Sequence, residues 1–316
     1  TLWLGLETNK VYHTDFRHVS LRVLHWGLRL LSGGRLGRGD VRGMVDTSPL
    51  AQFLRTHLIE KDGRVVGIDE NLQEAVIDAV AIITTNYASG LSEAWVQSVN
   101  EDLWQKGQLT SKPAELTVPH VLASAALPMF FPAISLDGQW HGDGGIRLSA
   151  PLSPAMHLGA ERILAVSPRA ADAASAQSGN EPYPSPAQIA GVLLNSVFLD
   201  LLDFDALQMQ RINELLEQIA PAQWDGFRPV EVMVLRPKED LGELARAHEL
   251  GLPKAFRFFG KGLENRREPS ADALSMVMFE PEYLSLLMTL GEQDTAARSE
   301  DIRDFLLAQA QGEKND

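Results

Sequence analysis

A tight hairpin near the middle of the chain is the feature that most restricts its fold. Asp137-Gly138 separates two extended segments, residues 133–136 and 139–140. This dipeptide favours a two-residue type I′ turn, in which both central residues take positive φ. Such a turn fixes the register of the two strands and therefore determines where the second strand ends. It ends in the run His141-Gly142-Asp143-Gly144-Gly145.

Asp143 in this run has the sequence surroundings of a residue that performs chemistry. The two glycines that follow it carry no side chain, so another chain segment or a substrate can come close to the backbone there. We therefore predict that Asp143 is presented to a partner and that Gly144 and Gly145 provide the approach.

The order of the expected elements favours an α/β fold. Residues 79–85 form a continuous apolar, β-rich run that is typical of a buried strand. Ser153-Pro154 begins a short helix after the hairpin, and residues 163–166 form another buried strand. Strand, helix and strand in this order predict a mostly parallel sheet. Pro281 and Ser299 predict the starts of two helices near the C-terminus.

The stretch before the hairpin reads Ala123-Ser124-Ala125-Ala126-Leu127-Pro128-Met129-Phe130-Phe131-Pro132. Together with the D-G-G that ends the hairpin, it resembles the patatin-like phospholipases of bacteria. In that family a small-residue helix of the form A-S-x-A-x-P-x-x-F-P precedes a hairpin that ends in D-G-G or D-G-A. The resemblance extends from about Val45 to Phe305. It implies a three-layer α/β core followed by C-terminal helices, and a lipid acyl hydrolase that uses a Ser–Asp dyad. Asp143 would then be the catalytic base, with Gly144 and Gly145 as the backbone of the motif.

One part of the family pattern is missing. The family's nucleophile lies on a G-x-S-x-G elbow, and a glycine-rich loop supplies oxyanion donors, both N-terminal to the segments quoted above. No G-x-S-x-G occurs in the 316 residues. We therefore expect a fragment that lacks both elements and is inactive by itself. An alternative is a non-catalytic lipid-binding or regulatory relative that lost its nucleophile in evolution, and a structural assembly module is a third hypothesis.

Three regions are expected along the chain: a basic helical segment over residues 1–44, the α/β core over 45–236, and a helical region over 237–316. Residues 1–44 carry a net charge of +4 in a chain whose net charge is −14. With interleaved aromatic residues this segment predicts a peripheral contact with anionic lipid at a membrane. A solvated helix pair whose aromatic residues pack on the domain explains the same pattern.

Composition removes several classes of function. The chain has no cysteine, which excludes disulfides, thiolate metal sites and cysteine nucleophiles. Its acidic charge argues against nucleic acid as a partner. No run of about 18 apolar residues exists, so we expect no membrane span and a cytoplasmic protein. No cofactor is predicted, and the expected partner is a lipid or fatty-acyl ester substrate.

Several other residues and segments are candidates for a functional role. His141 would share a strand face with Asp143, but two ligands without a third do not make a metal site, and none is predicted. His120 is a candidate for a Ser-His-Asp triad with Asp143, but the resemblance implies no histidine in the site. Ser124 is expected to be a packing residue. The glycine-rich run 32–39 follows a helical pattern and is expected to be a connector. Residues 170–186 predict an exposed loop, and the apolar stripe over 187–220 is expected to be core, with part of it as an alternative acyl-chain groove.

Overall fold

The computed structural model describes residues 3–13, 32, 43–100, 104–170, 189, 192–193, 196–198, 200–248 and 275–308. Most of the predicted basic segment, nearly all of the glycine-rich run and most of the predicted loop after residue 170 lie outside these residues. The boundaries expected at residues 44 and 236 stay predictions.

A six-stranded sheet carries the hairpin. Its strands lie in the order β5-β6-β4-β3-β8-β7. Their bounds are β3 (Ala79–Asn86), β4 (Ser92–Ser98), β5 (Gln105–Lys106), β6 (Leu109–Pro113), β7 (Ile134–Leu136) and β8 (Gln139–Asp143). Strand β4 pairs in parallel with β6, and the other four pairings are antiparallel. The prediction of a mostly parallel sheet is therefore wrong for this sheet.

The reason lies in the connections between the strands. A few residues join β3 to β4 and two join β7 to β8, and connections this short produce antiparallel pairs. The sequence predicted that the hairpin strand and β9 (Arg162–Val166), with a helix between them, lie in one parallel sheet. Instead β9 pairs with β10 (Glu231–Leu235) in a separate sheet. That pair is parallel. A further small hairpin joins β1 (Glu60–Lys61) and β2 (Arg64–Val65).

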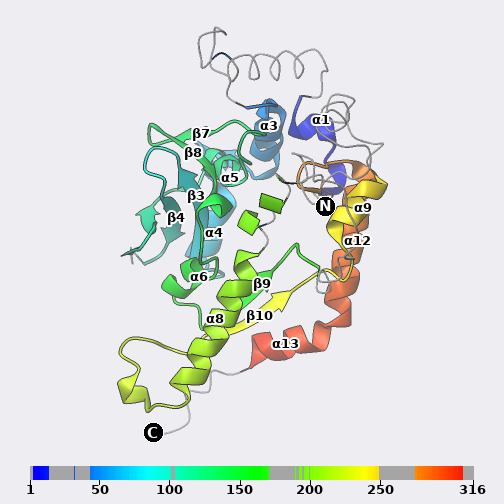
Figure 1. Ribbon diagram of the computed structural model, residues 1–316. Coiled ribbons are helices and arrows are strands. Elements are labelled where there is room, and N and C mark those ends of the chain that lie inside the picture. Colours follow the sequence, from blue (N-terminus) through cyan, green and yellow to red (C-terminus); the bar gives the residue numbers. More distant parts are fainter. Residues whose placement is uncertain are drawn as a thin grey trace.

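Both faces of the six-stranded sheet are covered. On one face Trp95 and Ile82 pack with Ala123 of α5 (Val118–Ser124), and Ile68 of α4 (Val66–Gln73) joins them. On the other face Ala94 and its neighbours pack against residues of the segment that runs from η2 (Gly144–Ile146) to the end of α6 (Ser153–His157). The predicted α/β class is thus confirmed, with the sheet as the middle of three layers (Figure 1).

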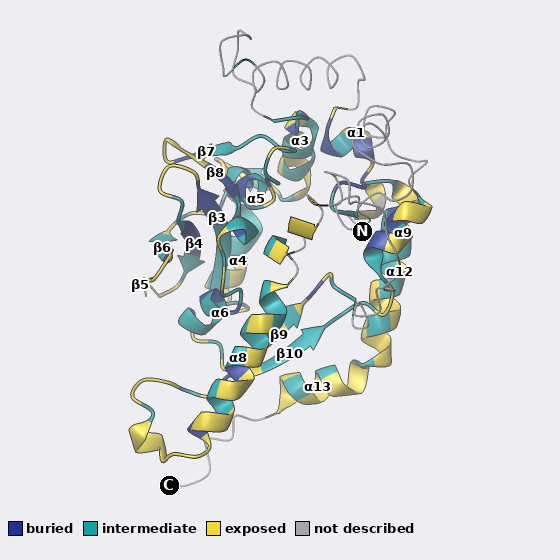
Figure 2. Ribbon diagram, in the orientation of Figure 1, coloured by how far each residue is buried: buried dark blue, intermediate teal, exposed yellow. Residues whose placement is uncertain are grey.

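Helices make up most of the described chain after β9. They are α8 (Leu201–Leu216), the 3-10 turn η3 (Pro221–Gln223), α9 (Leu241–Ala247), α12 (Pro281–Ala297) and α13 (Ser299–Leu307). The two predicted helix starts at Pro281 and Ser299 are confirmed, and so are the expected C-terminal helices. Figure 2 shows that α13 is largely exposed, whereas buried residues gather in β3, β4 and β8.

The beginning and the end of the described chain pack together. The N-terminal elements are η1 (Trp3–Gly5), α1 (Thr8–Val11) and, after a gap, α3 (Ser48–His57). The Tyr12 hydroxyl donates to the Val277 carbonyl at 2.9 Å, and the Thr8 hydroxyl donates to Glu280 at 2.8 Å.

No helix in the described part of the chain is both long and apolar enough to cross a membrane.

Candidate active site

The predicted hairpin turn is confirmed. Asp137 has φ of 49° and Gly138 has φ of 77°, as a type I′ turn requires. Strand β8 then pairs with β3 so that Thr84 lies opposite Asp143. The Asp143 N–H donates to the Ala126 carbonyl at 3.1 Å, which ties the end of β8 to the turn after α5. Asp143 therefore sits at a fixed point where β8 ends and η2 begins.

The Asp143 carboxylate is held at the start of η2. Its Oδ1 accepts a hydrogen bond from the Gly145 N–H at 2.8 Å, and its backbone carbonyl accepts one from the Thr85 hydroxyl at 2.7 Å. Burial raises the pKa of Asp143 to about 6, and the bond from Gly145 opposes this effect. A carboxylate with this pKa is still ionised at neutral pH but is a stronger base than an ordinary aspartate.

The glycines around Asp143 are needed because other residues lie too close for a side chain, and not because of a positive φ. None of Gly142, Gly144 and Gly145 has a positive φ. A Cβ on Gly142 would lie 2.1 Å from the Tyr87 hydroxyl oxygen, and one on Gly145 would lie 2.7 Å from the Phe198 ring. A Cβ on Gly144 would lie 2.4 Å from the Ile83 carbonyl oxygen. The sequence predicted that another chain segment or a substrate comes close to the backbone here. In the structure, other segments of the same chain do so.

Gly144→Ala is expected to destabilise the fold by roughly 1–3 kcal/mol or more, since its Cβ would meet rigid backbone of β3. Urea unfolding followed by circular dichroism measures the change. Gly291→Ala, inside α12 with open space around it, is the control and is expected to be neutral or slightly stabilising. Equal unfolding midpoints for the two variants would contradict the described contact.

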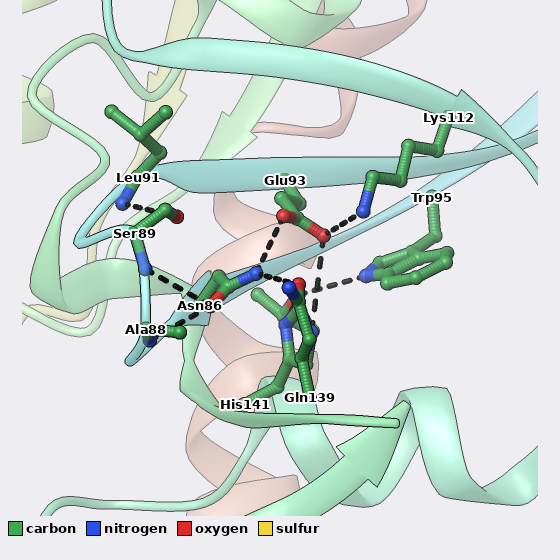
Figure 3. A network of polar contacts seen from close by, with 10 residues as sticks. Asn86, Ala88, Ser89, Leu91, Glu93, Trp95, Lys112, Gln139 and His141 are labelled. Atoms are coloured by element: carbon green, nitrogen blue, oxygen red, sulfur yellow. Dashed lines mark hydrogen bonds and ion pairs between the residues drawn. The ribbon is translucent and has the colours of Figure 1, made fainter. Parts of the chain in front are cut away.

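A largely buried polar network joins β3, β4, β6 and β8 (Figure 3). Lys112 donates to Glu93 at 2.7 Å, and the Asn86 amide donates to Glu93 at 2.8 Å and to Gln139 at 2.5 Å. The Trp95 indole N–H donates to the Thr84 hydroxyl at 2.8 Å. Paired polar groups inside a sheet favour one strand register, because a slip would leave them buried and unpaired. The network thus helps to fix where Asp143 lies.

His141 belongs to this network and does not join Asp143 in a ligand set. It is fully buried, and its Nδ1 lies 3.0 Å from the Thr84 hydroxyl. Its Nε2 faces a Glu93 oxygen at 3.8 Å without a hydrogen bond. Burial lowers the pKa of His141, and the neighbouring carboxylate favours the tautomer with the hydrogen on Nε2. Within the described part of the chain, no three His, Cys, Asp or Glu side chains gather as metal ligands would.

The other candidates have structural contacts. The His120 ring forms a capping box with Thr117 at the start of α5 and lies edge-on to Trp95. Ser124 is the last residue of α5 and is half-buried. Across the described residues, the hydrogen bond from Gly145 is the only one that the Asp143 carboxylate receives. The structure therefore assembles no triad of His120 with Asp143.

An apolar cavity of about 360 Å³ opens next to this motif. Gly145 lines it, with Phe198 beside that glycine, and most of the remaining lining is aliphatic: Leu148, Leu152, Ile163, Val197, Leu201 and Leu202. Part of the apolar stripe expected over residues 187–220 thus faces a cavity. The sequence did not single out Tyr87 or Phe198; the glycines at 142 and 145 signal a close neighbour but not which residue it is.

One of three comparisons with known proteins found a match. A family model described as patatin-like phospholipase matches residues 6–156. The matched range contains the small-residue helix, the hairpin and the Asp143-Gly144-Gly145 motif. No curated protein and no solved structure matched the chain. Residues 6–156 are thus similar to the patatin-like phospholipase family.

Proposed function

We propose that the chain supplies the general base, Asp143, of a Ser–Asp dyad that hydrolyses lipid acyl esters. The match of residues 6–156 to the patatin-like phospholipase family model supports lipid acyl hydrolysis. The observation that carries the assignment to Asp143 is its position: a half-buried carboxylate with a raised pKa, at the end of a strand and beside an apolar cavity. Perturbed carboxylates next to a cavity are typical of catalytic sites.

In the proposed reaction a serine hydroxyl attacks the ester carbonyl while the Asp143 carboxylate takes the hydroxyl proton. The tetrahedral intermediate collapses, and the protonated Asp143 returns that proton to the departing alcohol. A water molecule then attacks the acyl-serine while the Asp143 carboxylate takes a proton from it. As the fatty acid leaves, Asp143 returns this proton to the serine oxygen. The carboxylate ends the cycle in the state in which it began.

The serine is the part of the proposal that these residues do not supply. No G-x-S-x-G occurs in them, and the second oxygen of Asp143, Oδ2, receives no hydrogen bond from the described part of the chain. We propose that the nucleophile comes from outside the 316 residues and meets Asp143 at this oxygen.

The cavity beside Gly145 supports an acyl chain as the group bound there. Its volume of about 360 Å³ lies at the lower end of ligand pockets, which span roughly 300–1,000 Å³. Its largely aliphatic lining suits a hydrocarbon and offers few partners to a polar group. The ester group of such a substrate would lie near the Asp143 carboxylate, which is hydrogen-bonded to Gly145 of the cavity lining.

A second candidate is a non-catalytic lipid-binding relative. It is favoured by the same apolar cavity together with the absence of a G-x-S-x-G in the 316 residues. Such a protein would bind lipid without turning it over.

Labelling with a fluorophosphonate, which reacts with activated serines, separates the two. In the intact protein that contains these residues we expect one labelled serine, and Asp143→Asn is expected to suppress its labelling. Asp137→Asn, in the turn of the same hairpin, is the control, since Asn-Gly is an equally good type I′ turn. Folded protein that binds lipid but takes no label would favour the non-catalytic candidate.

A further inference from the structure

Tyr87 is placed next to the proposed base by two elements. It follows directly on Asn86, the last residue of β3, and its N–H donates to the Trp140 carbonyl of β8 at 2.9 Å. The phenol lies over Gly142, where a Cβ would be 2.1 Å from the hydroxyl oxygen and 2.5 Å from Cζ. The side chain thus rests on the residue that precedes Asp143.

The phenol is open to a ligand. The Tyr87 side chain is 47% exposed, and within the described residues its hydroxyl makes no hydrogen bond. Burial of part of the ring and, second, the negative charge of Asp143 raise the pKa of Tyr87. The group therefore keeps its proton at neutral pH, and a neutral phenol both donates and accepts hydrogen bonds.

Phe198 occupies the corresponding place on the other side of Asp143 along the chain. Its ring lies against Gly145, where a Cβ would be 2.7 Å from Cδ1, and it lines the apolar cavity. Asp143 is therefore flanked by two aromatic contacts of different chemistry. One carries a hydroxyl and the other borders a space lined by aliphatic side chains.

We infer that Tyr87 is a specificity-determining residue that hydrogen-bonds the alcohol portion of the ester, while the acyl chain lies in the cavity beside Phe198. This inference rests on the proposed acyl hydrolase function. An acyl ester has one polar and one hydrocarbon side around its carbonyl, and the phenol and the cavity match these two sides. A glycerol hydroxyl or phosphate oxygen is the type of group that the phenol would bind.

The inference can be tested by binding, without turnover. The ligands are 1-O-decylglycerol, a non-hydrolysable ether with a polar alcohol end, and decyl methyl ether, which has the same chain without that end. Dissociation constants are measured by displacement of a fluorescent fatty acid from wild type, Tyr87→Phe and Phe198→Ala. Tyr87→Phe keeps the ring and removes only the hydroxyl.

Tyr87→Phe is expected to weaken the binding of decylglycerol by roughly 2- to 12-fold, the effect of one neutral hydrogen bond, and to leave decyl methyl ether unchanged. Phe198→Ala is expected to weaken both ligands to a similar extent. The inference is overturned if Tyr87→Phe affects the two ligands equally or neither of them, or if wild type binds neither. If Tyr87 only packs on Gly142, Tyr87→Phe would change the binding of the two ligands equally or not at all.

A separate experiment tests whether the Tyr87 phenol lies close to the Asp143 carboxylate. In Asp143→Asn the pKa of Tyr87, followed by its NMR titration, is expected to fall towards the ordinary value of a tyrosine because the carboxylate charge is gone. An unchanged pKa would overturn the placement. The binding and titration measurements need no catalysis. The inference about Tyr87 can therefore fail while the esterase assay succeeds, and it can hold while the esterase assay fails.

Discussion

Asp143→Asn is expected to lower kcat/KM of the intact protein for a soluble acyl ester by about 10²–10⁴-fold, the contribution of a general base. The amide cannot accept the serine proton, so attack on the carbonyl loses its proton acceptor. The amide oxygen can still accept the hydrogen bond that Gly145 donates to Oδ1, so the turn into η2 is expected to persist. The measurement is initial-rate kinetics with a p-nitrophenyl ester, after circular dichroism has shown that the variant is folded.

Asp137→Asn is the matched control for this result. It makes the same chemical change in the same hairpin, six residues away, and Asn is well tolerated at positive φ. Its kcat/KM is expected to stay within about twofold of wild type. If Asp143→Asn keeps wild-type activity while folded, Asp143 is not the base.

The same substitution is expected to stabilise the fold at pH 8 by about 3 kcal/mol. The folded-state pKa of Asp143, about 6, lies above the ordinary value of 3.8. Folding therefore opposes ionisation of this group, and one pKa unit corresponds to about 1.4 kcal/mol. Below pH 3.8 both states hold the proton and the penalty is absent. It grows between pH 3.8 and 6 and is fully present above pH 6.

Urea unfolding of wild type and Asp143→Asn at pH 4 and pH 8 measures this penalty. The difference in unfolding free energy is expected to be small at pH 4 and largest at pH 8. A variant that is less stable than wild type at pH 8 would show that the carboxylate stabilises the fold, which contradicts the raised pKa. Gain of stability on loss of a catalytic group is the usual relation at sites strained for function.

The sequence predicted the elements whose signals are local. Asp137-Gly138 determined the turn by the positive φ of both residues, and Pro281 and Ser299 marked helix starts. The run over residues 79–85 became β3, with one further residue. Each of these depends on chemistry within a few residues, which a single sequence displays.

The way in which distant segments pack against one another could not be predicted from such local signals. The order of strands depends on which strand edges meet after a long connection. Strands β9 and β10 are an example, because their paired residues, such as Arg162 and Glu231, are 69 residues apart in sequence. The Glu93–Lys112 pair and its link to His141 also come from separate strands. Asp143 was found because the motif around it is contiguous, whereas Tyr87 and Phe198 reach it from distant segments.

The pH dependence of kcat/KM tests the central claim, that Asp143 is the base, most directly. The acid limb of this profile reports the pKa of the group that must be deprotonated in the free enzyme. Measured from pH 4 to 8 on the intact protein with a substrate that does not titrate, kcat/KM is expected to rise about tenfold per pH unit below pH 6 and to level off above pH 7. A profile that is flat from pH 4.5 to 8, or whose limb lies near the ordinary aspartate value, would contradict the account.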